Sequence, residues 1–588
     1  MRGTRSETEV NPFPPTSLRP PTELDRICAL PILDPNWQAP DQTHLYRRPG
    51  GFQTLRPSQS KGLAYASLYR GLFALMDVGA GKTLLSLLIP LAVNAQRPLL
   101  LIPPTQRADL RAQWQKYANH WRLPTRLEVK TYDLLSQPDA TAMLQHLRPD
   151  AIICDEAHKL ADRKSTRTRR FMRYMEEHSE VMFFAMSGSF STRSVEEYAH
   201  LIACALGRNS PLPINSYTEL KDFAQALDVF RNTRVQLELD ADDDLGFEDL
   251  IEETTSVRGQ ARQRLQPLCK LFRTDNVREA YRLRLISCPG VVYTPEASVN
   301  IPVEITCRTN VAIPASVQAA LQTLAEWWVT PSGEELEDGL AYNRARRQLS
   351  GGMFYRWVWP EGKPDEAERL WLDCRAGWHR ALRQWLPRSQ IGRDSPALTE
   401  RTAEREPRLL PGYVLEAWYK WRPLKDRPEP PQEAVWLDPF LVYDAVAWAQ
   451  AQREPVLIWY DETAIGQAIA QVGGYRFADV GPEADQMLAD LKQAETLVLS
   501  IKAHGTGKNL QLWKNQIVAS PPANGRAWQQ LIGRTRRPGQ TADVIRVTYY
   551  GHTDVFAASM RNAREEARYI EQTKGTPQIL NQARFFVD

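Results

Sequence analysis

Short apolar runs alternate with longer amphipathic segments in the first third of the chain. Each run has the length of one buried strand, and the apolar positions between the runs have the spacing that is typical of helices. Polar residues gather where the runs end, not inside them. The runs occupy residues 71–76, 98–102, 151–154 and 181–186. This alternation predicts a doubly wound parallel sheet covered by helices.

The same alternation returns near the end of the chain, where four more apolar runs predict the strands of a second sheet. These runs occupy residues 456–460, 496–500, 516–519 and 544–548. We therefore expect an α/β fold with two parallel-sheet lobes and a helical insertion and linker region between them. The expected units are an extended N-terminal arm at 1–50, a first lobe at 51–205, a helical and acidic insertion at 206–300, a tryptophan-rich helical linker at 301–439, a second lobe at 440–560 and a C-terminal tail at 561–588.

Composition narrows the class of protein without indicating a function. The 588 residues carry a net charge of only +3, so a surface for nucleic acid would have to be a local patch. The seven cysteines include no C-x-x-C pair, which argues against a zinc site or a disulfide framework and fits a reducing compartment. No apolar run approaches the roughly 20 residues that span a bilayer, and the polar N-terminus shows no secretory signal. We expect a cytoplasmic protein without a membrane partner.

A glycine loop follows the first apolar run. Gly79, Ala80 and Gly81 precede Lys82 and Thr83, and a segment with helical character comes next. Strand, glycine loop and helix in this order form a cradle in which backbone N–H groups bind phosphates. The lysine would reach the β- and γ-phosphates, and the threonine would bind Mg²⁺. The loop lacks the first glycine of the usual pattern, so the alternative is a chance occurrence in a surface turn.

Polar side chains also end two later strands of the first lobe. Asp155 and Glu156 close the third run, and Ser187 and Ser189 close the fourth. Ligands of open parallel sheets bind at this carboxyl edge. One carboxylate there can hold Mg²⁺ through water, and its neighbour can position or deprotonate an attacking water. A solvated surface pair is the alternative interpretation of the two acids.

Four other segments carry weaker signals. The amide of Gln59 has the donor and acceptor that suit the edge of adenine, although a plain polar position near a helix start is the alternative. The basic run at 163–170 either contacts phosphates or forms a solvated helix face. The acidic run at 240–253 fails as a calcium loop, because Ile251 stands where a ligand is needed. Tryptophans gather between 301 and 440, where a helical core is favoured over stacking on bases.

Taken together, these segments resemble the motifs of the superfamily 2 helicases, most closely those of the Snf2-type branch. The resemblance covers residues 51–205 and 440–555. The matching segments lie at 55–59 (the adenine-side motif), 77–83 (motif I), 101–105 with Trp114 (motif Ia), 131–133 (motif Ib), 155–158 (the Asp-Glu-Ala-His box), 187–189 (motif III), 500–510 (motif V) and 530–540 (motif VI). Motif III departs from the family, since Ser-Gly-Ser stands in place of a threonine-rich triplet. The large accessory regions and histone-binding modules of the family's remodellers are not visible.

The resemblance implies two RecA-like lobes with ATP and Mg²⁺ held between them. It implies nucleotide-binding roles for Gln59, Gly79, Ala80, Gly81, Lys82, Thr83, Gly507 and Gln530, metal-binding roles for Thr83 and Asp155, catalytic roles for Lys82, Asp155, Glu156, Arg534 and Arg537, and coupling roles for His158, Ser187 and Ser189. Glu156 would orient the attacking water, and the two arginines would reach across from the second lobe to stabilise charge on the transferred phosphoryl group. Hydrolysis would then require the lobes to close.

The implied function is a DNA motor of a phage or bacterial cell, a duplex translocase or helicase that couples ATP hydrolysis to movement. Duplex or forked DNA would be held at its phosphates. A partner from replication, recombination or transcription would fit, and the oligomeric state is open, with a monomer compatible. One alternative is a strand-separating or branch-remodelling helicase on forked DNA or RNA. Another is a nucleic-acid-binding scaffold that ATP only switches in shape. A small-molecule kinase is disfavoured, because it has no use for a second lobe without a phosphate loop.

Overall fold

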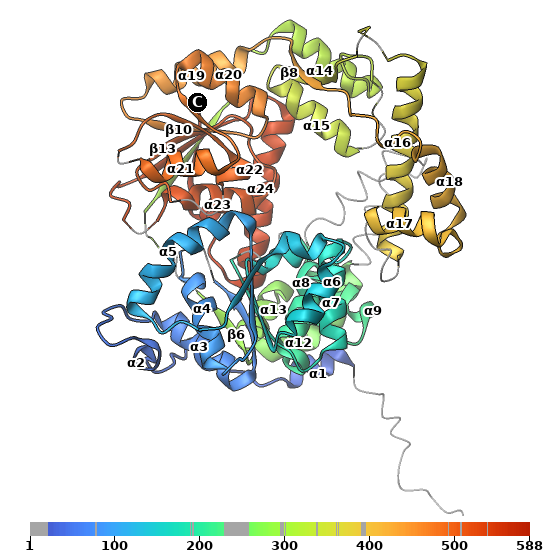
Figure 1. Cartoon of the computed structure of the whole chain (residues 1–588). Helices are drawn as coiled ribbons and strands as arrows, with labels where there is room; N and C mark the ends of the chain where they lie inside the picture. The colour runs from blue at the N-terminus through green and yellow to red at the C-terminus, as the bar shows by residue number, and fades with distance from the viewer. Residues whose placement is uncertain are drawn as a thin grey trace, which may run out of the picture.

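The computed structural model shows two parallel sheets, each with helices on both faces (Figure 1). This arrangement confirms the predicted α/β class. The structure describes the whole chain apart from residues 1–21, 77–78, 189, 191–192, 229–257, 295–298, 300, 335, 337–338, 360, 363, 390–395, 492, 506–508 and 538. The acidic run at 240–253 and the site candidates Ser189 and Gly507 therefore lie outside the described residues.

The first sheet has parallel strands in the order β3-β2-β4-β5-β1-β6. Its strands are β1 (Gly71–Leu75), β2 (Pro98–Ile102), β3 (Glu128–Thr131), β4 (Ala151–Asp155), β5 (Met182–Ser187) and β6 (Val291–Tyr293). Side chains alternate between two apolar cores, with Phe73 and Leu75 in one core and Leu72 and Ala74 in the other. Because helices cover both faces, the central strands are apolar at nearly every position, and this is the pattern that made them visible in the sequence.

Helices from a longer stretch of sequence than expected cover this first sheet. They are α1 (Glu23–Ala29), α2 (Thr43–Tyr46), α3 (Pro57–Tyr69), α4 (Lys82–Ala92), α5 (Arg107–His120), α6 (Ala140–Leu147), α7 (Thr166–Glu177), α8 (Glu196–Leu206), α9 (Tyr217–Leu227), α12 (Gln266–Phe272) and α13 (Val277–Ile286). Ile27 of α1, Phe223 of α9 and Tyr281 of α13 lie in one common core. The described part of the expected N-terminal arm and of the expected insertion at 206–300 therefore packs into the first lobe, which differs from the predicted division.

The second sheet is also parallel, in the order β11-β12-β10-β13-β14-β7-β15. Its strands are β7 (Val303–Arg308), β10 (Val456–Tyr460), β11 (Arg476–Ala478), β12 (Leu497–Ser500), β13 (Asn515–Val518), β14 (Ile545–Tyr550) and β15 (Arg584–Val587). Its helices are α19 (Phe440–Ala451), α20 (Thr463–Gly473), α21 (Pro482–Asp490), α22 (Ile501–His504), α23 (Gly525–Thr535), α24 (Asp554–Lys574) and α25 (Ile579–Gln582).

Two strands of the second sheet come from outside the expected lobe at 440–560. β7 lies in the stretch expected to be linker, and Val303 aligns with Ile545 of β14. β15 lies in the stretch expected to be a tail, and Phe585 aligns with Ile305. Both strands were missed for different reasons. β7 alternates buried and half-buried positions before a half-buried end, and β15 is largely exposed, so neither forms a buried apolar run.

Between β7 and α19 the chain leaves the second lobe. It forms α14 (Ala315–Trp327), α15 (Gly339–Ser350) and β8 (Met353–Trp357), which pairs antiparallel with β9 (Gln432–Trp436). Between these two strands lie α16 (Glu366–Trp385), α17 (Pro396–Arg405) and α18 (Gly412–Trp421), hereafter the helical bridge (residues 366–421).

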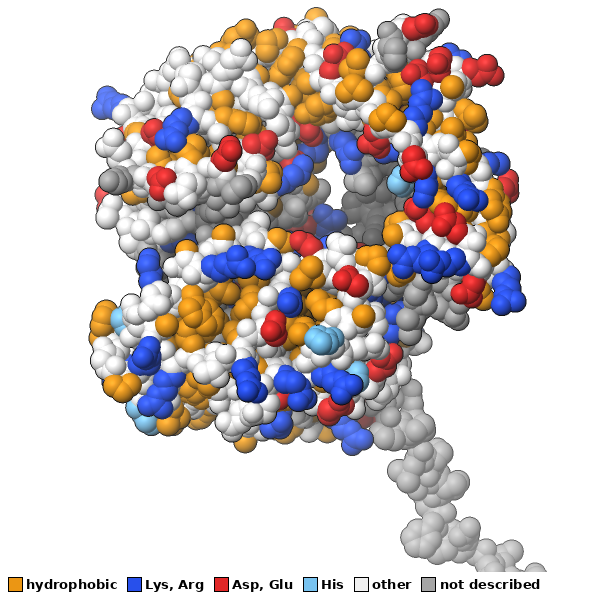
Figure 2. Space-filling view, in the orientation of Figure 1, with side chains coloured by type: hydrophobic (Ala, Val, Ile, Leu, Met, Phe, Trp, Pro, Cys, Tyr) orange, Lys and Arg blue, Asp and Glu red, His pale blue; other side chains and the backbone are white. Residues whose placement is uncertain are grey.

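The helical bridge has an apolar core of its own. Trp371, Trp378, Trp418 and Trp421 pack together there, and α16 lies along α18. This confirms the interpretation of these four tryptophans as helical core. In the view of Figure 2 a gap lies beside the helical bridge.

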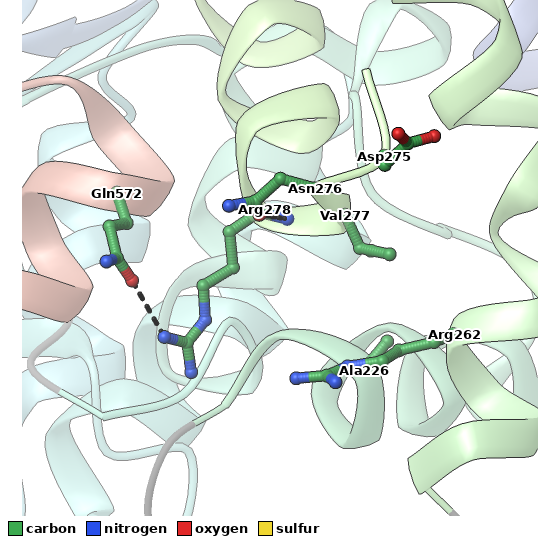
Figure 3. Close-up of a pocket in the computed structure, with 7 residues that line it drawn as sticks. All are labelled: Ala226, Arg262, Asp275, Asn276, Val277, Arg278 and Gln572. Carbon is green, nitrogen blue, oxygen red and sulfur yellow. Dashed lines mark hydrogen bonds between the residues drawn. The ribbon is translucent and has the colours of Figure 1, made fainter.

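The two lobes contact each other where α24 packs against α13. Arg278 of α13 donates a hydrogen bond of 2.8 Å to the amide oxygen of Gln572 (Figure 3). Arg193 donates from Nε to Glu566 at 2.7 Å, and the side chain of Glu566 is fully buried. These contacts hold α24, although it belongs to the second lobe, against the first lobe.

Three further findings concern the chain as a whole. None of the helices that the structure describes is long and apolar enough to cross a membrane. All seven cysteines are free thiols. Within the described ranges, no three His, Cys, Asp or Glu side chains are grouped in a way that could hold a metal ion.

Candidate active site

A cleft of about 370 Å³ lies between the two lobes. It is lined by Gly79, Gly81, Lys82, Thr83, Ser86, Leu100, Ile102, Gln106, Leu110, Gln113, Tyr117, Asp155 and Glu156 from the first lobe and by Asn509, Gln511, Arg534 and Arg537 from the second. The cleft therefore brings together the glycine loop, the two acids and the two arginines that the sequence singled out, although they come from distant parts of the chain.

The topology of the first sheet explains why the glycine loop and the acids meet. β1, β5 and β4 are neighbours, with Leu75 aligned to Ser187 and Met186 aligned to Asp155. All three strands are parallel, so their carboxyl ends lie at one edge of the sheet, which is where ligands of such sheets bind. The glycine loop leaves β1 at this edge and leads directly into α4.

The glycine loop is held from beneath by Gln59. Its Nε2 donates to the carbonyl of Gly81 at 3.0 Å, and its Oε1 accepts from the backbone N–H of Arg56 at 2.8 Å. Gly81 has a φ of 85°, and a Cβ at this position would lie 2.3 Å from Nε2 of Gln59. Glycine is therefore required for two reasons, the left-handed backbone and the close approach of the amide.

Gln59 and Ala80 are buried beneath the loop surface. Gln59 is only 3% exposed and Ala80 only 6%, and neither lines the cleft. The amide that was expected to read adenine is engaged with the backbone of the loop in this conformation. The amide therefore holds the loop in place. These two hydrogen bonds use one N–H and one acceptor site of the amide, which has a second N–H and a second acceptor site.

The side chains of Lys82 and Thr83 point to the two acids. Nζ of Lys82 lies 3.6 Å from Oε1 of Glu156 and donates to the carbonyl of Met76 at 3.2 Å. Oγ1 of Thr83 lies 3.5 Å from Oδ2 of Asp155. The cation therefore lies beside one carboxylate and the hydroxyl beside the other, at the edge of the sheet where the sequence places all four residues.

Glu156 has an unusual backbone conformation. Its φ of 56° and ψ of 49° lie in the left-handed region, which costs a non-glycine residue energy and is concentrated at functional sites. The turn directs its carboxylate toward a polar cluster, where Oε2 lies 3.2 Å from Nδ1 of His158 and 3.3 Å from Oγ of Ser187. His158 and Ser187 are 3.0 Å apart, so these two candidates for coupling contact the candidate catalytic acid directly.

The environment drives the pKa values of the two adjacent acids in opposite directions. Burial, together with the charge of Glu156, raises the pKa of Asp155 to about 6. Burial also acts to raise the pKa of Glu156, but Lys82, His158 and Arg534 outweigh it and hold that pKa well below its usual value. Glu156 is therefore ionised at neutral pH. Burial lowers the pKa of His158 to about 4, and Arg526 adds to the shift, so this imidazole is neutral.

The two arginines of the segment 530–540 enter the cleft from α23 and the turn that follows it. Nε of Arg534 donates to the carbonyls of Gly505 and Gln530, at 3.0 and 3.1 Å. Nε of Arg537 donates to the carbonyl of Gly533 at 2.9 Å. Arg534 is 5% exposed, so it also belongs to the packing of the second lobe, whereas Arg537 is half-buried at the cleft. Gln530 enters this network through its backbone carbonyl.

Sequence reasoning missed three contributions to the site. Arg56 donates to the carbonyl of Gly79 and so braces the loop from the start of α3. Helix α5 supplies Gln113 and Tyr117 to the wall of the cleft, and Gln106 lies there just before the helix begins. Arg526, at the start of α23, acts electrostatically on Glu156 from the second lobe. The position of Arg56 beside Gln59 was a usable signal, but nothing in the sequence indicates which amphipathic helix faces the cleft.

The basic run at 163–170 does not act as one surface. Arg170 is 3% exposed and donates to the carbonyls of Leu135 and Gln137, which makes it part of the first-lobe core. Arg163 and Lys164 are exposed. The two interpretations of this run, contact with phosphates or a solvated helix face, therefore concern its exposed residues and not Arg170.

The donor set of the cleft fits a nucleoside triphosphate and Mg²⁺. A glycine loop at the start of α4, a lysine and two arginines suit a polyphosphate. One hydroxyl and one carboxylate suit Mg²⁺, which keeps several waters and takes few protein ligands. Neither the models of known protein families nor the curated proteins searched include a match to this chain. The chemistry of the cleft therefore carries the functional assignment.

Proposed function

We infer that this protein is an ATPase that is stimulated by nucleic acid and moves on DNA. The observation that carries this proposal is the cleft itself, in which the glycine loop and two acids of one lobe face two arginines of the other. An enzyme that needed only to bind a nucleotide would not require groups from both lobes. A site divided between two bodies is assembled when they approach, which couples the reaction to their separation.

The residues of the cleft have distinct roles in this proposal. The glycine loop and Lys82 would hold the phosphates, and Thr83 and Asp155 would hold the metal. Bound Mg²⁺-ATP supplies the phosphoryl group that is transferred to water. The ionised carboxylate of Glu156 would orient a water and accept its proton.

Arg534 and Arg537 would stabilise the negative charge that develops on the transferred group. Such an arginine contributes roughly 10³–10⁵ in rate. Because both residues belong to the second lobe, a change in the distance between the lobes would switch this contribution on and off. His158 and Ser187 contact Glu156 and lie at the edge of the sheet, where they could relay that change.

Two considerations support DNA as the partner. The sequence resembles the Snf2-type helicases in motifs of both lobes, and the duplex translocases belong to that branch. Exposed basic residues, including Arg163 and Lys164, follow the acid motif directly. Contacts to phosphates would give binding with little sequence preference. We place the protein in the cytoplasm of a prokaryotic or phage-infected cell as part of the same proposal.

Steady-state ATP hydrolysis tests the proposal when it is measured without nucleic acid and with single-stranded, duplex and forked DNA and RNA in parallel. Strong stimulation by plain duplex supports the translocase. Stimulation by forks or single strands alone supports a strand-separating helicase. Nucleotide binding without hydrolysis under any of these conditions contradicts the proposal and supports the ATP-switched scaffold.

A further inference from the structure

The second half of α24 contacts the first lobe, although the helix belongs to the second. The hydroxyl of Tyr569 donates to Oδ1 of Asp228 at 3.2 Å, and Gln572 accepts from Arg278 at 2.8 Å (Figure 3). The family resemblance ends at residue 555, just after α24 begins, so it gives these contacts no role. A further contact, at Glu566, differs from them because the same carboxylate also binds a second helix.

The carboxylate of Glu566 binds both lobes at once. Oε1 accepts from Nε of Arg193, which lies between β5 and α8 of the first lobe, and Oε2 accepts from the backbone N–H of Gly525 at 2.7 Å. Gly525 is the first residue of α23, and the N–H groups of a first helical turn have no partner inside their own helix. The side chain of Glu566 is fully buried. A carboxylate can be buried only when its oxygens are bonded, so these two bonds define its position.

The start of α23 lies directly against α24. A Cβ at Gly525 would lie 2.7 Å from the carbonyl oxygen of Ala563 and 3.2 Å from the backbone nitrogen of Ala567, so this close approach requires glycine. The place where α23 begins is therefore set by α24. Glu566 connects that place to Arg193 and so to the first lobe.

Electrostatic attraction from both lobes adds to this connection. Arg526 is the second residue of α23, and its Nε is buried. Burial lowers the pKa of Arg526, and three nearby glutamates oppose this shift, namely Glu197, Glu566 and Glu156. Two of the three belong to the first lobe, so the charge at the start of α23 is attracted to that lobe as well.

The other end of α23 reaches the cleft. Arg534 lies in the last turn of the helix and lines the cleft together with Glu156. Nine residues at a rise of about 1.5 Å each separate Gly525 from Arg534, so a rigid element about 13 Å long joins them. Glu566 is not among the described residues that line the cleft. A displacement at the start of α23 would nevertheless be transmitted along the helix to Arg534.

We propose that Glu566 is a positioning residue for the hydrolysis of ATP. Through Arg193 and Gly525 it holds α23 at the distance from the first lobe at which Arg534 enters the cleft. This role rests on the proposed function, which supplies the reaction. The bond to Gly525 lies within the second lobe, whereas the ion pair with Arg193 joins the lobes and favours the conformation in which Arg534 faces Glu156.

The kinetics of Arg193→Ala test this role, because the Arg193 side chain is 51% exposed and its loss removes no part of either core. We expect kcat to fall by about 10–10²-fold, since a displacement of about 1 Å at a catalytic group can cost this much. KM for ATP should stay within about twofold, because the phosphate loop belongs to the first lobe. Arg193→Lys, which keeps the charge, should recover part of the rate.

Arg476→Ala is the matched control. Arg476 also pairs with a glutamate, Glu495, at 2.7 Å, and its side chain is 52% exposed, but this pair lies within the second lobe. Its loss should leave kcat and KM unchanged. Thermal unfolding of each variant shows that the protein used in the assay is folded.

The Arg534→Ala background shows whether Glu566 acts through Arg534. In single-turnover hydrolysis, adding Arg193→Ala to this background should lower the rate by less than about twofold, because the group that it positions is already absent. Glu566→Gln removes the charge and keeps the shape of the side chain, so it should behave like Arg193→Ala in both backgrounds. If Glu566→Gln does not fold, the Arg193 variants decide.

The possible results separate this role from the proposed function. An unchanged kcat of folded Arg193→Ala, or an equal fall of the rate with and without Arg534, would overturn the positioning role and leave the proposed function intact. Absence of ATP hydrolysis by the unmodified protein, with or without nucleic acid, would overturn the proposed function and this inference with it.

Discussion

Nζ of Lys82 lies 3.6 Å from Oε1 of Glu156 inside the cleft. The positive charge of the lysine keeps the glutamate ionised. In return, the carboxylate pairs with the ammonium group, and a bound phosphate would take the place of the carboxylate in this ion pair. Glu156→Gln should therefore retain nucleotide binding but lose hydrolysis by about 10²–10⁴-fold, because the amide cannot accept a proton from water. Binding of a fluorescent ATP analogue and release of phosphate measure the two effects separately. Normal turnover by the variant would remove Glu156 from its proposed role.

The two arginines of the cleft should differ when they are replaced. Arg537→Ala should lower hydrolysis by about 10³-fold or more with nearly unchanged thermal stability, because Arg537 is half-buried at the cleft. Arg534→Ala should lower both hydrolysis and stability, because Arg534 is buried and bonds to Gly505 and Gln530. Steady-state rates and thermal unfolding curves for both variants distinguish these effects. Equal loss of stability in the two variants would show that Arg537 also serves packing.

Gln59 supports the glycine loop. This role predicts how the alanine variant binds ATP relative to GTP. Gln59→Ala removes the bonds to the carbonyl of Gly81 and the N–H of Arg56. We expect affinity for ATP and for GTP to fall by a similar factor, about tenfold, since two hydrogen bonds are lost at a site that both nucleotides share. Competition binding with the two nucleotides measures this. A loss confined to ATP would show instead that Gln59 reads adenine, as the family resemblance implies.

Lys574 gives the contact between the lobes a dependence on pH. The residue is fully buried at the end of α24, and its Nζ lies 5.1 Å from the centre of the Tyr198 ring of the first lobe. Burial lowers the pKa of Lys574 to about 7, and Arg526 adds to this, while Glu197 and Asp228 oppose it. Burial likewise raises the pKa of Asp228 to about 7.

Between pH 7 and 10.5 the unfolded state holds a proton on Lys574 that the folded state lacks. The free energy of unfolding should therefore rise with pH in this window by about 1.4 kcal/mol per unit from this group. Lys574→Met abolishes the effect, so its stability relative to the unmodified protein should be greatest below pH 7 and should fall toward pH 10. Urea unfolding at several pH values measures the difference. A difference independent of pH would mean that the lysine is not buried in the folded protein.

Asp228→Asn provides the complementary measurement. Here the folded state holds a proton that the unfolded state loses between pH 3.8 and about 7, so the contribution of Asp228 to stability falls as the pH rises through this window. The asparagine variant should therefore gain stability relative to the unmodified protein as the pH rises from 4 to 7. The two variants thus have opposite signs of pH dependence in adjacent windows.

The sequence pattern predicted the central strands and the residues at their ends. β1, β2, β4 and β5 of the first sheet are buried on both faces, so each is a run of apolar residues. β4 ends in Asp155 and β5 in Ser187. In a parallel sheet the carboxyl ends of the strands lie at one edge, where ligands bind. This constraint predicted that Lys82, which follows β1, and Asp155, which ends β4, would lie in the same site. These parts of the fold and the site need no information beyond the local sequence.

Contacts between distant segments were not predictable in this way. β6 has only three residues and β15 is largely exposed, so neither gives an apolar run. Arg169 and Arg170 are neighbours in one basic run, yet one binds the helical bridge and the other the first-lobe core. The partners of the two arginines lie between 33 and 220 positions away, so a local pattern does not show which of the two is buried.

The position of β7 has a consequence for biosynthesis. β7 pairs with β14, and the helical bridge and most of the second lobe are translated between them. The ribosome therefore releases β7 long before its partner exists, at a time when the first lobe can already fold. An unpaired strand edge is a site of aggregation, so the nascent chain is most vulnerable during this interval. A chaperone that covers this edge, or slower growth at low temperature, should raise the yield of the intact protein more than that of its first lobe.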